Sequence, residues 1–446
     1  MRAGFSKIDI TPPLDRIEAY GIGYWYQRAV RFTGVRDPLF VRTLALDKQI
    51  IISVDSIFDS FGFVPDASAR IAAALDIPEA NIFITCTHTH SSPLIDRNNT
   101  HRGVEYGAFV TDRIVASAVE AARNSADTTI SVGAGRVADV LYNRRPLLAD
   151  GRIAELHALI SDSVVDPGPI NDTMTIVKFQ NQGGELLGGL CHFSIHGVAV
   201  QCSELMSGDC MGRAIQAAEQ AFGGIVLLHL NGPCADIDPA LMGDDRSLDL
   251  MTTRLTDGIK TVAAAASEPV RVKESRPSGS GTFRAQRREA RPPAILERKQ
   301  KALASISDVG IHHHSGAGYE AFLLAEEQAV SELPLQFDIS YQILRCGDLV
   351  LVGIAGEVFT CFGLALQAAR PDLLILPVGL TGGANGYLPA KEMFAQGGYE
   401  VACARWCPIA PGESEKLFAQ ITAELELLGQ AGSVLAGCQP AQNEAR

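Results

Sequence analysis

Residues 82–90, Ile-Phe-Ile-Thr-Cys-Thr-His-Thr-His, join an apolar run to two histidines. The run Ile82-Phe83-Ile84 is typical of a short buried strand. Side chains two apart on a strand project to the same face, so we expect His88 and His90 to point together from its C-terminal end. Ligand sites in α/β folds are usually built at such strand ends. The stretch therefore predicts a metal site or a general acid–base pair.

A second stretch repeats this arrangement. Residues 191–196, Cys-His-Phe-Ser-Ile-His, follow the small and apolar run 186–190, which also reads as a strand leaving the core. His192 and His196 are four apart and would share a face of a regular strand. Two such stretches favour a metal, because imidazole is a common zinc ligand. Hydrogen-bonded core histidines are the alternative for either stretch.

The composition excludes some classes of partner. The chain has 446 residues, of which 47% are hydrophobic and 20% charged, and its net charge is −13. This charge disfavours nucleic acid and anionic membranes, which both need a basic face. We see no apolar run long enough to span a bilayer and no signal peptide at the start. We therefore expect a cytoplasmic protein with thiol cysteines, no stable membrane association and a small-molecule substrate. Nothing in the sequence sets its oligomeric state.

Strand-like and helix-like segments alternate from residue 1 to about 270 and again after 335. Apolar runs predict strands and Ala-rich or amphipathic runs predict helices. The predicted helices are 67–75, 111–122, 359–369 and 413–428, and the predicted strands include 43–47, 50–55, 225–230, 341–345, 349–354 and 374–380. The pattern indicates an α/β (α+β) fold with mixed β-sheets flanked by helices. We expect one catalytic domain over 1–446, with a lid or excursion at about 271–335.

The excursion contains an arginine cluster, formed by Arg284, Arg287, Arg288 and Arg291 in a Pro/Gly/Ser-rich stretch. A charged helix is expected after it, at about 294–306. Such a cluster is usually a solvated face, and anion binding is the alternative. The triple histidine 312–314 lies among glycines and is expected to be a mobile loop that binds metal only adventitiously.

Taken in order along the chain, several motifs resemble the neutral (non-lysosomal) ceramidase family, specifically its N-terminal catalytic domain. The matching segments extend over nearly the whole sequence and are 7–13 (Lys-Ile-Asp-Ile-Thr-Pro-Pro), 37–39, 87–91, His196, 207–209, 231–239, 356–357 and 386–387. The resemblance implies the fold of that catalytic domain. The family's C-terminal immunoglobulin-like domain is expected to have no counterpart, because the chain ends soon after the last predicted helix.

The resemblance also implies a zinc site. Its ligands would be His88, His196, Glu357 and Tyr387. His90 would stand beside the metal, and Arg144 would bind substrate, with Arg145 as an adjacent competitor. Two imidazoles and a carboxylate leave zinc with positive charge and room for a water, which can attack a polarised amide carbonyl. Asp209 is expected to accept a hydrogen bond from a ligand imidazole.

Each assignment has a structural alternative. Glu357 could cap the helix that follows it, because carboxylates favour helix N-termini. Tyr387 could be a packed turn aromatic. His192 and His229 are interpreted as hydrogen-bonded core histidines and stay outside the ligand set.

Asp238 marks a departure from the family, which carries a serine at this position. It could be a general base, a second metal contact or a ligand for a substrate hydroxyl. The leading interpretation is a zinc-dependent hydrolase of an amide C–N bond in a soluble substrate, with proton delivery by His90 or Asp238. The alternatives are a zinc-dependent lyase or glycoside-cleaving enzyme on a sugar-like substrate, and a non-catalytic metal-binding homologue.

Overall fold

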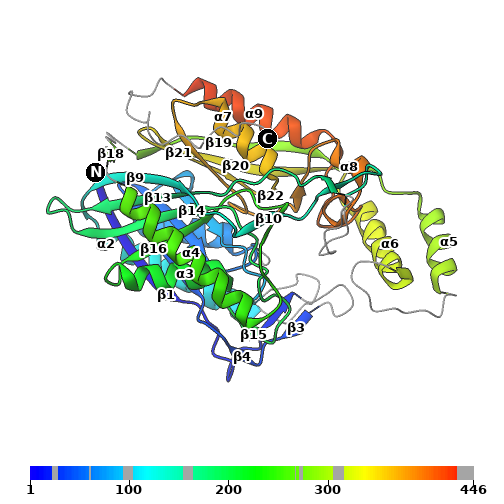
Figure 1. Ribbon diagram of the computed structural model, residues 1–446, viewed down its shortest axis with the longest axis horizontal. Coiled ribbons are helices and arrows are strands. Elements are labelled where there is room, and N and C mark those ends of the chain that lie inside the picture. The colour runs from blue at the N-terminus through cyan, green and yellow to red at the C-terminus, as the bar shows by residue number, and fades with distance from the viewer. Residues whose placement is uncertain are drawn as a thin grey trace.

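The computed structural model describes residues 1–22, 29–59, 62–93, 104–153, 164–266, 268–270, 275–304 and 316–428. The triple histidine 312–314 lies outside these residues. Three larger β-sheets form the body of the described chain, and helices lie outside them (Figure 1). This confirms the predicted α/β class with mixed sheets and flanking helices.

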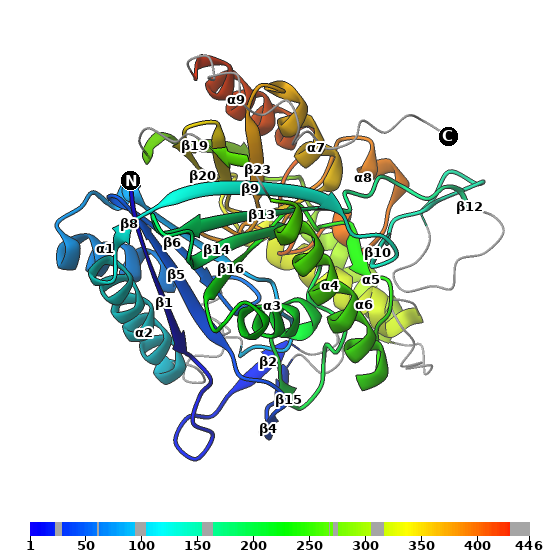
Figure 2. The ribbon, with the colours of Figure 1, turned by 60° about the vertical axis from the view of Figure 1, so that its left-hand side comes forward.

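The first sheet joins its strands in the order β7-β6-β5-β1-β8. The strands are β1 (Arg2–Asp9), β5 (Phe40–Leu46), β6 (Gln49–Val54), β7 (Ile82–Cys86) and β8 (Ala126–Asp127). Alternate residues of β6 face opposite sides, since Ile50 and Ile52 pack with the helices and Ile51 packs toward the other sheets. Helices α1 (Phe63–Leu75) and α2 (Val104–Arg123) cover the outer side (Figure 2).

The second sheet has the order β16-β14-β13-β9-β18. Its strands are β9 (Thr129–Arg136), β13 (Thr173–Gln180), β14 (Leu186–Phe193), β16 (Val226–Asn231) and β18 (Glu268–Val270). Helices α3 (Asp209–Ala221) and α4 (Asp245–Ala265) pack on its outer side through residues such as Ile215 and Leu255. Asp244 caps α4 by accepting a hydrogen bond from the Ser247 amide at 2.7 Å.

The third sheet has the order β19-β20-β21-β23. Its strands are β19 (Ser275–Gln286), β20 (Gln336–Cys346), β21 (Leu349–Ile354) and β23 (Leu374–Val378), and α7 (Thr360–Ala369) and α9 (Glu413–Leu427) cover it. Between β19 and β20 the chain forms α5 (Pro293–Ala304) and α6 (Gly316–Glu332). These two helices lie together at one end of the molecule (Figure 1). The helix expected at about 294–306 is therefore α5.

One apolar cluster is shared by the three sheets. Its members include Phe5 and Phe83 from the first sheet, Phe179 and Leu230 from the second, and Leu351 and Leu376 from the third. Burial of apolar surface on both sides of each sheet explains why most of these strands read as continuous apolar runs rather than as alternating ones. The sheets thus meet around a common core, with their helices outside.

Each larger sheet contains one parallel pair of strands, which are β6–β7, β14–β16 and β21–β23. The other pairs in these sheets are antiparallel. In a parallel pair, both strands end at the same edge of the sheet, and the loops that follow them can place polar groups there. The polar motifs of the sequence follow these strands.

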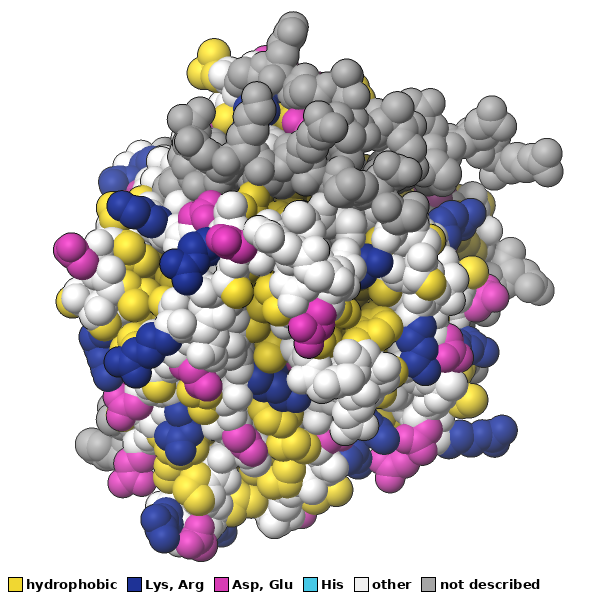
Figure 3. Space-filling model, turned by 90° about the vertical axis from the view of Figure 1, so that its left-hand side faces the viewer, with side chains coloured by type: hydrophobic (Ala, Val, Ile, Leu, Met, Phe, Trp, Pro, Cys, Tyr) yellow, Lys and Arg dark blue, Asp and Glu magenta, His cyan; other side chains and the backbone are white. Residues whose placement is uncertain are grey.

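Smaller elements complete the described chain. The short strands are β2 (Tyr20–Ile22), β3 (Ala29–Arg31), β4 (Gly34–Val35), β10 (Leu141–Asn143), β11 (Leu147–Leu148), β12 (Val164–Asp166), β15 (Leu205–Met206), β17 (Ile237–Pro239), β22 (Glu357–Val358) and β24 (Tyr387–Leu388). The short helices are η1 (Glu79–Asn81), α8 (Met393–Gln396) and η2 (Tyr399–Val401). No helix among the described residues has the length and apolar character needed to cross a bilayer. On the face drawn in Figure 3, acidic and basic side chains are interspersed.

Candidate metal and catalytic site

Three histidines converge where the first and second sheets end. His88 and His90 follow β7, and His196 follows β14. The Nε2 atom of His196 lies 3.0 Å from Nε2 of His88 and 3.0 Å from Nε2 of His90. All three histidines lie beyond the strands, so the face-sharing argument from strand geometry does not apply. His88 instead has φ 67°, a left-handed turn that directs its ring toward His196.

The hydrogen bonds of the two buried rings decide where their protons are. His88 Nδ1 lies 2.7 Å from the carbonyl oxygen of Ile57, and His196 Nδ1 lies 3.2 Å from that of Cys234. A carbonyl only accepts, so His88 carries its hydrogen on Nδ1 and presents a lone pair on Nε2. His196 Nδ1 also lies 3.4 Å from Arg144 Nη1, a donor, and the shorter contact with the Cys234 carbonyl favours the same assignment for this ring. Burial, followed by the charge of His88, lowers the pKa of His196 well below its usual value, which keeps this ring neutral. Two lone pairs thus face each other, an arrangement that a shared cation satisfies.

Glu357 and Tyr387 follow strands β21 and β23 of the third sheet, and their segments lead to the same place. They are register partners in the short parallel pair β22–β24. Glu357 Oε2 lies 3.4 Å from His88 Nε2, and this buried oxygen has no hydrogen-bond partner among the described residues. Burial and the charge of Glu357 raise the pKa of the Tyr387 phenol. The structure thus brings the four residues that the resemblance implies as ligands into one region.

The alternative role of Glu357 is not observed, whereas Tyr387 does pack against the rings of Phe359 and Tyr399. Helix α7 is capped by Asp236, whose Oδ1 accepts from the amide and the hydroxyl of Thr360 at 2.9 and 2.8 Å, so Glu357 is not its cap. The Tyr387 hydroxyl accepts a hydrogen bond from Arg144 Nη2 at 2.9 Å.

Asp209 was expected to accept a hydrogen bond from a ligand imidazole, and this expectation is wrong. The Asp209 carboxylate accepts hydrogen bonds from the backbone amides of Ala199, Val200 and Cys210. The rings of His88 and His196 are held by backbone carbonyl oxygens instead.

The donor atoms fit a divalent cation. Two imidazole nitrogens and a carboxylate oxygen without a hydrogen-bond partner match the ligand types of zinc, and the Tyr387 phenol offers a further oxygen. Cys234 is a further candidate, since its thiol, His88 and His196 offer ligand atoms within 4.8 Å of one another. The thiol accepts from Asn231 Nδ2 at 3.5 Å, and burial raises its pKa. The sequence prediction did not include Cys234, because a single cysteine in a loop has no ligand spacing.

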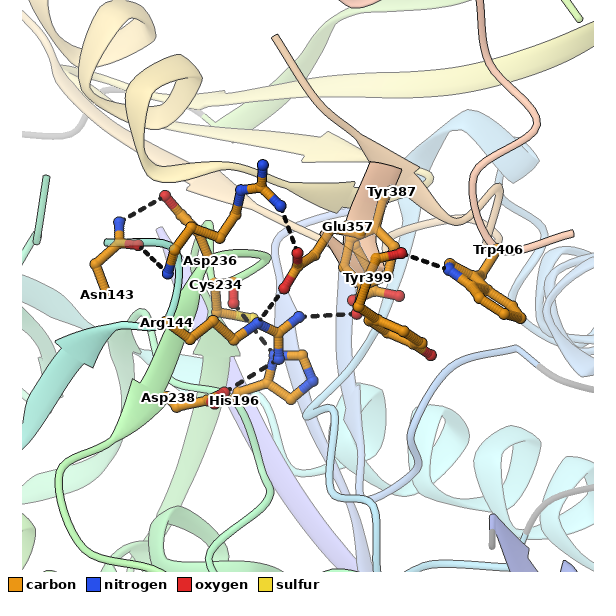
Figure 4. A network of polar contacts seen from close by, with 12 residues as sticks. Asn143, Arg144, His196, Cys234, Asp236, Asp238, Glu357, Tyr387, Tyr399 and Trp406 are labelled. Atoms are coloured by element: carbon orange, nitrogen blue, oxygen red, sulfur yellow. Dashed lines mark hydrogen bonds and ion pairs between the residues drawn. The ribbon is translucent and has the colours of Figure 1, made fainter. Parts of the chain in front are cut away.

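Arg144 lies beside His196, with its Nη1 3.4 Å from His196 Nδ1, within a buried charge network (Figure 4). Its Nη1 lies 3.1 Å from Asp238 Oδ1, and its Nε lies 2.8 Å from Glu400 Oε1. Arg145 pairs with the second carboxylate oxygen of Glu400, with its Nη1 2.6 Å from Oε2. Burial opposes ionisation of Glu400, but the two guanidinium groups outweigh it and lower its pKa. Of the two adjacent arginines, Arg144 alone contacts Tyr387.

Asp238 is the second carboxylate of this network that pairs with Arg144. It is fully buried, and Tyr142, its register partner in the β10–β17 pair, donates to its Oδ2 at 3.3 Å.

Glu400 was not predicted from the sequence, where it follows Gly397-Gly398-Tyr399 without any periodic signal. His192 and His229 are core histidines as expected, and their Nε2 atoms lie 2.7 and 3.2 Å from the carbonyl oxygens of Pro377 and Phe193.

A cavity of about 540 Å³ opens onto the cluster. Its polar lining includes His88, His90, Glu357, Tyr387 and Tyr399, whereas Arg144 and Asp238 are not among its described lining residues. Most of its remaining wall is apolar and comprises Ile22, Ile57, Phe58, Leu333, Pro334, Phe337, Leu380, Trp406 and Pro408. A volume of this size holds a small organic molecule, with a few polar groups at one place to orient it.

Comparison with known proteins relates this geometry to a family. Residues 1–244 match the family described as neutral/alkaline non-lysosomal ceramidase, N-terminal. The chain is similar to the crystal structure of neutral ceramidase from Pseudomonas aeruginosa, at 19% identity and a TM-score of 0.69, over 97% of this chain and 76% of that one. It is also similar to a ceramidase complexed with C2, at 18% identity with the same TM-score and coverage. No curated protein matches it.

Proposed function

We propose that this chain, which belongs to the neutral/alkaline non-lysosomal ceramidase family and is thereby a hydrolytic amidase, cleaves the amide C–N bond of a small soluble substrate with a zinc ion. The ligands would be His88, His196, Glu357 and Tyr387. One observation carries the metal assignment, namely two imidazole lone pairs 3.0 Å apart beside the partnerless Oε2 of Glu357. Bound zinc would supply an activated water and polarise the amide carbonyl.

The chain's own residues have separate roles in this proposal. His90 lines the cavity 3.0 Å from His196, which favours it as the group that donates a hydrogen bond or proton to the reacting amide. Arg144 holds the phenolic oxygen of Tyr387 at 2.9 Å. Asp238 forms an ion pair with Arg144. Because Asp238 is buried, we assign it the positioning of Arg144 rather than the proton delivery that the sequence analysis considered.

The cavity supports a substrate with an apolar portion next to the scissile amide. A structural neighbour is a ceramidase complexed with C2, which supports an amide as the reacting group. We propose a soluble amide rather than a membrane lipid, because Asp238 replaces the family serine. We also propose the cytoplasm as its location, on the support of the nine described cysteines, all of which are free thiols.

Hydrolysis in heavy-oxygen water tests the reaction. Zinc-loaded protein is given soluble N-acyl amines, and short- and long-chain ceramides in detergent as the comparison. We expect label in the carboxylate product and faster turnover of the soluble amides. Faster cleavage of the ceramides would overturn the soluble substrate, and amide cleavage that is unchanged by full zinc removal would overturn the zinc assignment.

A further inference from the structure

A short loop beside the proposed metal ligands forms part of the cavity wall. It comprises Ala384, Asn385, Gly386 and Tyr387, all of which line the cavity. The Glu357 amide donates to the Gly386 carbonyl at 2.8 Å, so the loop adjoins both Glu357 and Tyr387. Asn385 precedes Tyr387 by two residues, and two residues of chain span at most about 7 Å. The Asn385 backbone therefore lies close to the place proposed for the reaction.

Backbone contacts hold this loop from two sides. The Asn385 amide donates to the Ala355 carbonyl at 3.1 Å, and the Tyr387 amide donates to the Trp406 carbonyl at 2.7 Å. Between them, Gly386 has φ 76°, and a Cβ at this position would lie only 2.1 Å from the Trp406 carbonyl oxygen. This close approach requires glycine. The Asn385 backbone is thus fixed in place before any substrate binds.

The side chain of Asn385 is held at one end only. Its Nδ2 donates to the Ala355 carbonyl at 2.9 Å. Because a carbonyl only accepts, this contact distinguishes the nitrogen of the side-chain amide from its oxygen. Among the residues that the structure describes, none donates a hydrogen bond to Asn385 Oδ1. The residue is half-buried on the cavity wall and so offers a ligand an amide oxygen with both lone pairs free.

Other polar side chains of the wall differ from Asn385, because they are already engaged. Glu326 and Arg405 hold each other through two hydrogen bonds of 2.8 and 2.6 Å. Trp406 Nε1 donates to the Tyr399 carbonyl at 3.0 Å. The Asn385 oxygen is thus an acceptor that neither these contacts nor the proposed metal chemistry uses.

We infer that Asn385 Oδ1 accepts a hydrogen bond from the substrate and selects amides that carry an N–H or hydroxyl donor next to the scissile bond. The inference rests on the proposed amidase function of this cavity. An apolar group against the oxygen would remove its water without supplying a partner, which is unfavourable. A donor supplies that partner, and little ordering is needed because the Ala355 carbonyl already holds the side chain. Two donors fit, namely the N–H of the scissile amide itself and a hydroxyl on the amine portion.

A set of matched amides tests the inference and identifies the donor. The parent is an N-acyl-2-aminoethanol, which carries both donors. Its methyl ether lacks the hydroxyl donor, its N-methyl derivative lacks the N–H, and a third derivative lacks both. Each is prepared with several acyl chain lengths. Hydrolysis by zinc-loaded protein is followed by mass spectrometry, and binding to the same protein by calorimetry.

We expect loss of the donor that Asn385 accepts to lower kcat/KM roughly tenfold, and the other donor to matter less. Asn385→Leu should reduce this penalty to about twofold or less, because the acceptor is gone. Asn385→Asp keeps an acceptor oxygen and should retain the preference. Zinc per chain is measured in each variant, so that a disturbed metal site is recognised.

Asn81→Leu is the matched control. Asn81 Nδ2 also donates to a backbone carbonyl, that of Lys48 at 3.1 Å, but Asn81 is not among the described residues that line the cavity. The donor preference should therefore be unchanged in this variant.

The outcomes separate the inference from the function on which it rests. Equal binding and turnover of the parent and the probe without donors, by the unaltered protein, would overturn the inference whatever the folding of the variants. A tenfold penalty that persists in Asn385→Leu with full zinc content would overturn it as well. An Asn385-dependent preference in binding, without hydrolysis of any probe, would instead support the acceptor and overturn the amidase. Binding of none of the probes would overturn both.

Discussion

Two pairs of buried histidines differ in what their second ring nitrogen meets. His88, His196, His192 and His229 are all at most 2% exposed, and each places one ring nitrogen against a backbone carbonyl. In the pair His88–His196 the remaining nitrogens face each other at 3.0 Å. In the other pair, His229 Nδ1 is buried and has no hydrogen-bond partner among the described residues. Burial alone therefore does not identify a ligand.

The position of each pair in its strand explains the difference. His192 lies within β14 and His229 within β16, where side chains are fixed by the pleat among neighbouring strands. His88 and His196 lie beyond the ends of β7 and β14, where the chain can turn two rings toward one point. Only the pair at the strand ends can also meet Glu357 and Tyr387. The comparison predicts that one pair binds metal and the other contributes only to stability.

Replacing a histidine of the first pair should have the largest effect. His196→Ala removes a proposed ligand nitrogen. We therefore expect the variant to lose its bound zinc and its amidase activity to fall to the rate measured without enzyme. The loss of zinc affinity should exceed the roughly 10–100-fold that removal of a ligand's hydrogen-bond partner costs. Zinc per chain by elemental analysis, together with hydrolysis of a soluble amide, provides the measurement. Full zinc occupancy in this variant would contradict the division between the two pairs.

The matched variant in the second pair is His192→Ala. It leaves the Pro377 carbonyl without its 2.7 Å partner and opens a small cavity, so we expect a loss of about 1–3 kcal/mol in unfolding free energy. Zinc per chain should remain that of the unaltered protein. Denaturant unfolding with zinc analysis of the folded fraction checks both. A variant that folds but lacks zinc would assign His192 to the metal site.

Acid should destabilise the protein through the second pair. Burial lowers the pKa of His192 to about 4 and that of His229 to about 3. Unfolded histidine takes up a proton near pH 6.5, so the unfolded state gains protons first and stability falls from about pH 6.5 down to those values. We expect about 1 kcal/mol per histidine for the first pH unit below 6.5.

Unfolding in urea across this pH range measures the acid effect. A shallower decline in His192→Gln than in the unaltered protein would sharpen the comparison, because one of the two titrating rings is gone. Identical slopes in the two proteins would show that this ring does not titrate on unfolding in the expected window.

The smallest effect is expected at Asp238. Asp238→Asn removes one of the two carboxylates that hold Arg144 and leaves Glu400 in place. We expect kcat to fall by about tenfold or less with zinc content unchanged, because the residue acts through Arg144. Steady-state kinetics with zinc analysis measures this. A loss of activity as large as that of His196→Ala would mean that Asp238 itself takes part in the reaction.

Sequence reasoning reached the fold and the four proposed ligands because these depend on local and ordered signals. Apolar runs such as 82–84 and 349–354 indicated strands, and the motifs that follow them occur in the family's order. The left-handed turn at His88 was not predictable, since non-glycine residues adopt it only at a few per cent of positions. Glu400 and Cys234 were missed because their roles depend on three sheets meeting in space. The arginine cluster gave no sign of its partners, which are mainly distant carbonyls and carboxylates.

X-ray absorption at the zinc edge of zinc-loaded protein tests the central claim most directly. Ligation by His88, His196, Glu357 and Tyr387 predicts a first shell of nitrogen and oxygen atoms at about 2.0–2.2 Å, with the outer scattering of two imidazoles. This signal should disappear in His196→Ala and persist in His192→Ala. A sulfur atom at about 2.3 Å would contradict the account, because Cys234 would then hold the metal together with the histidines.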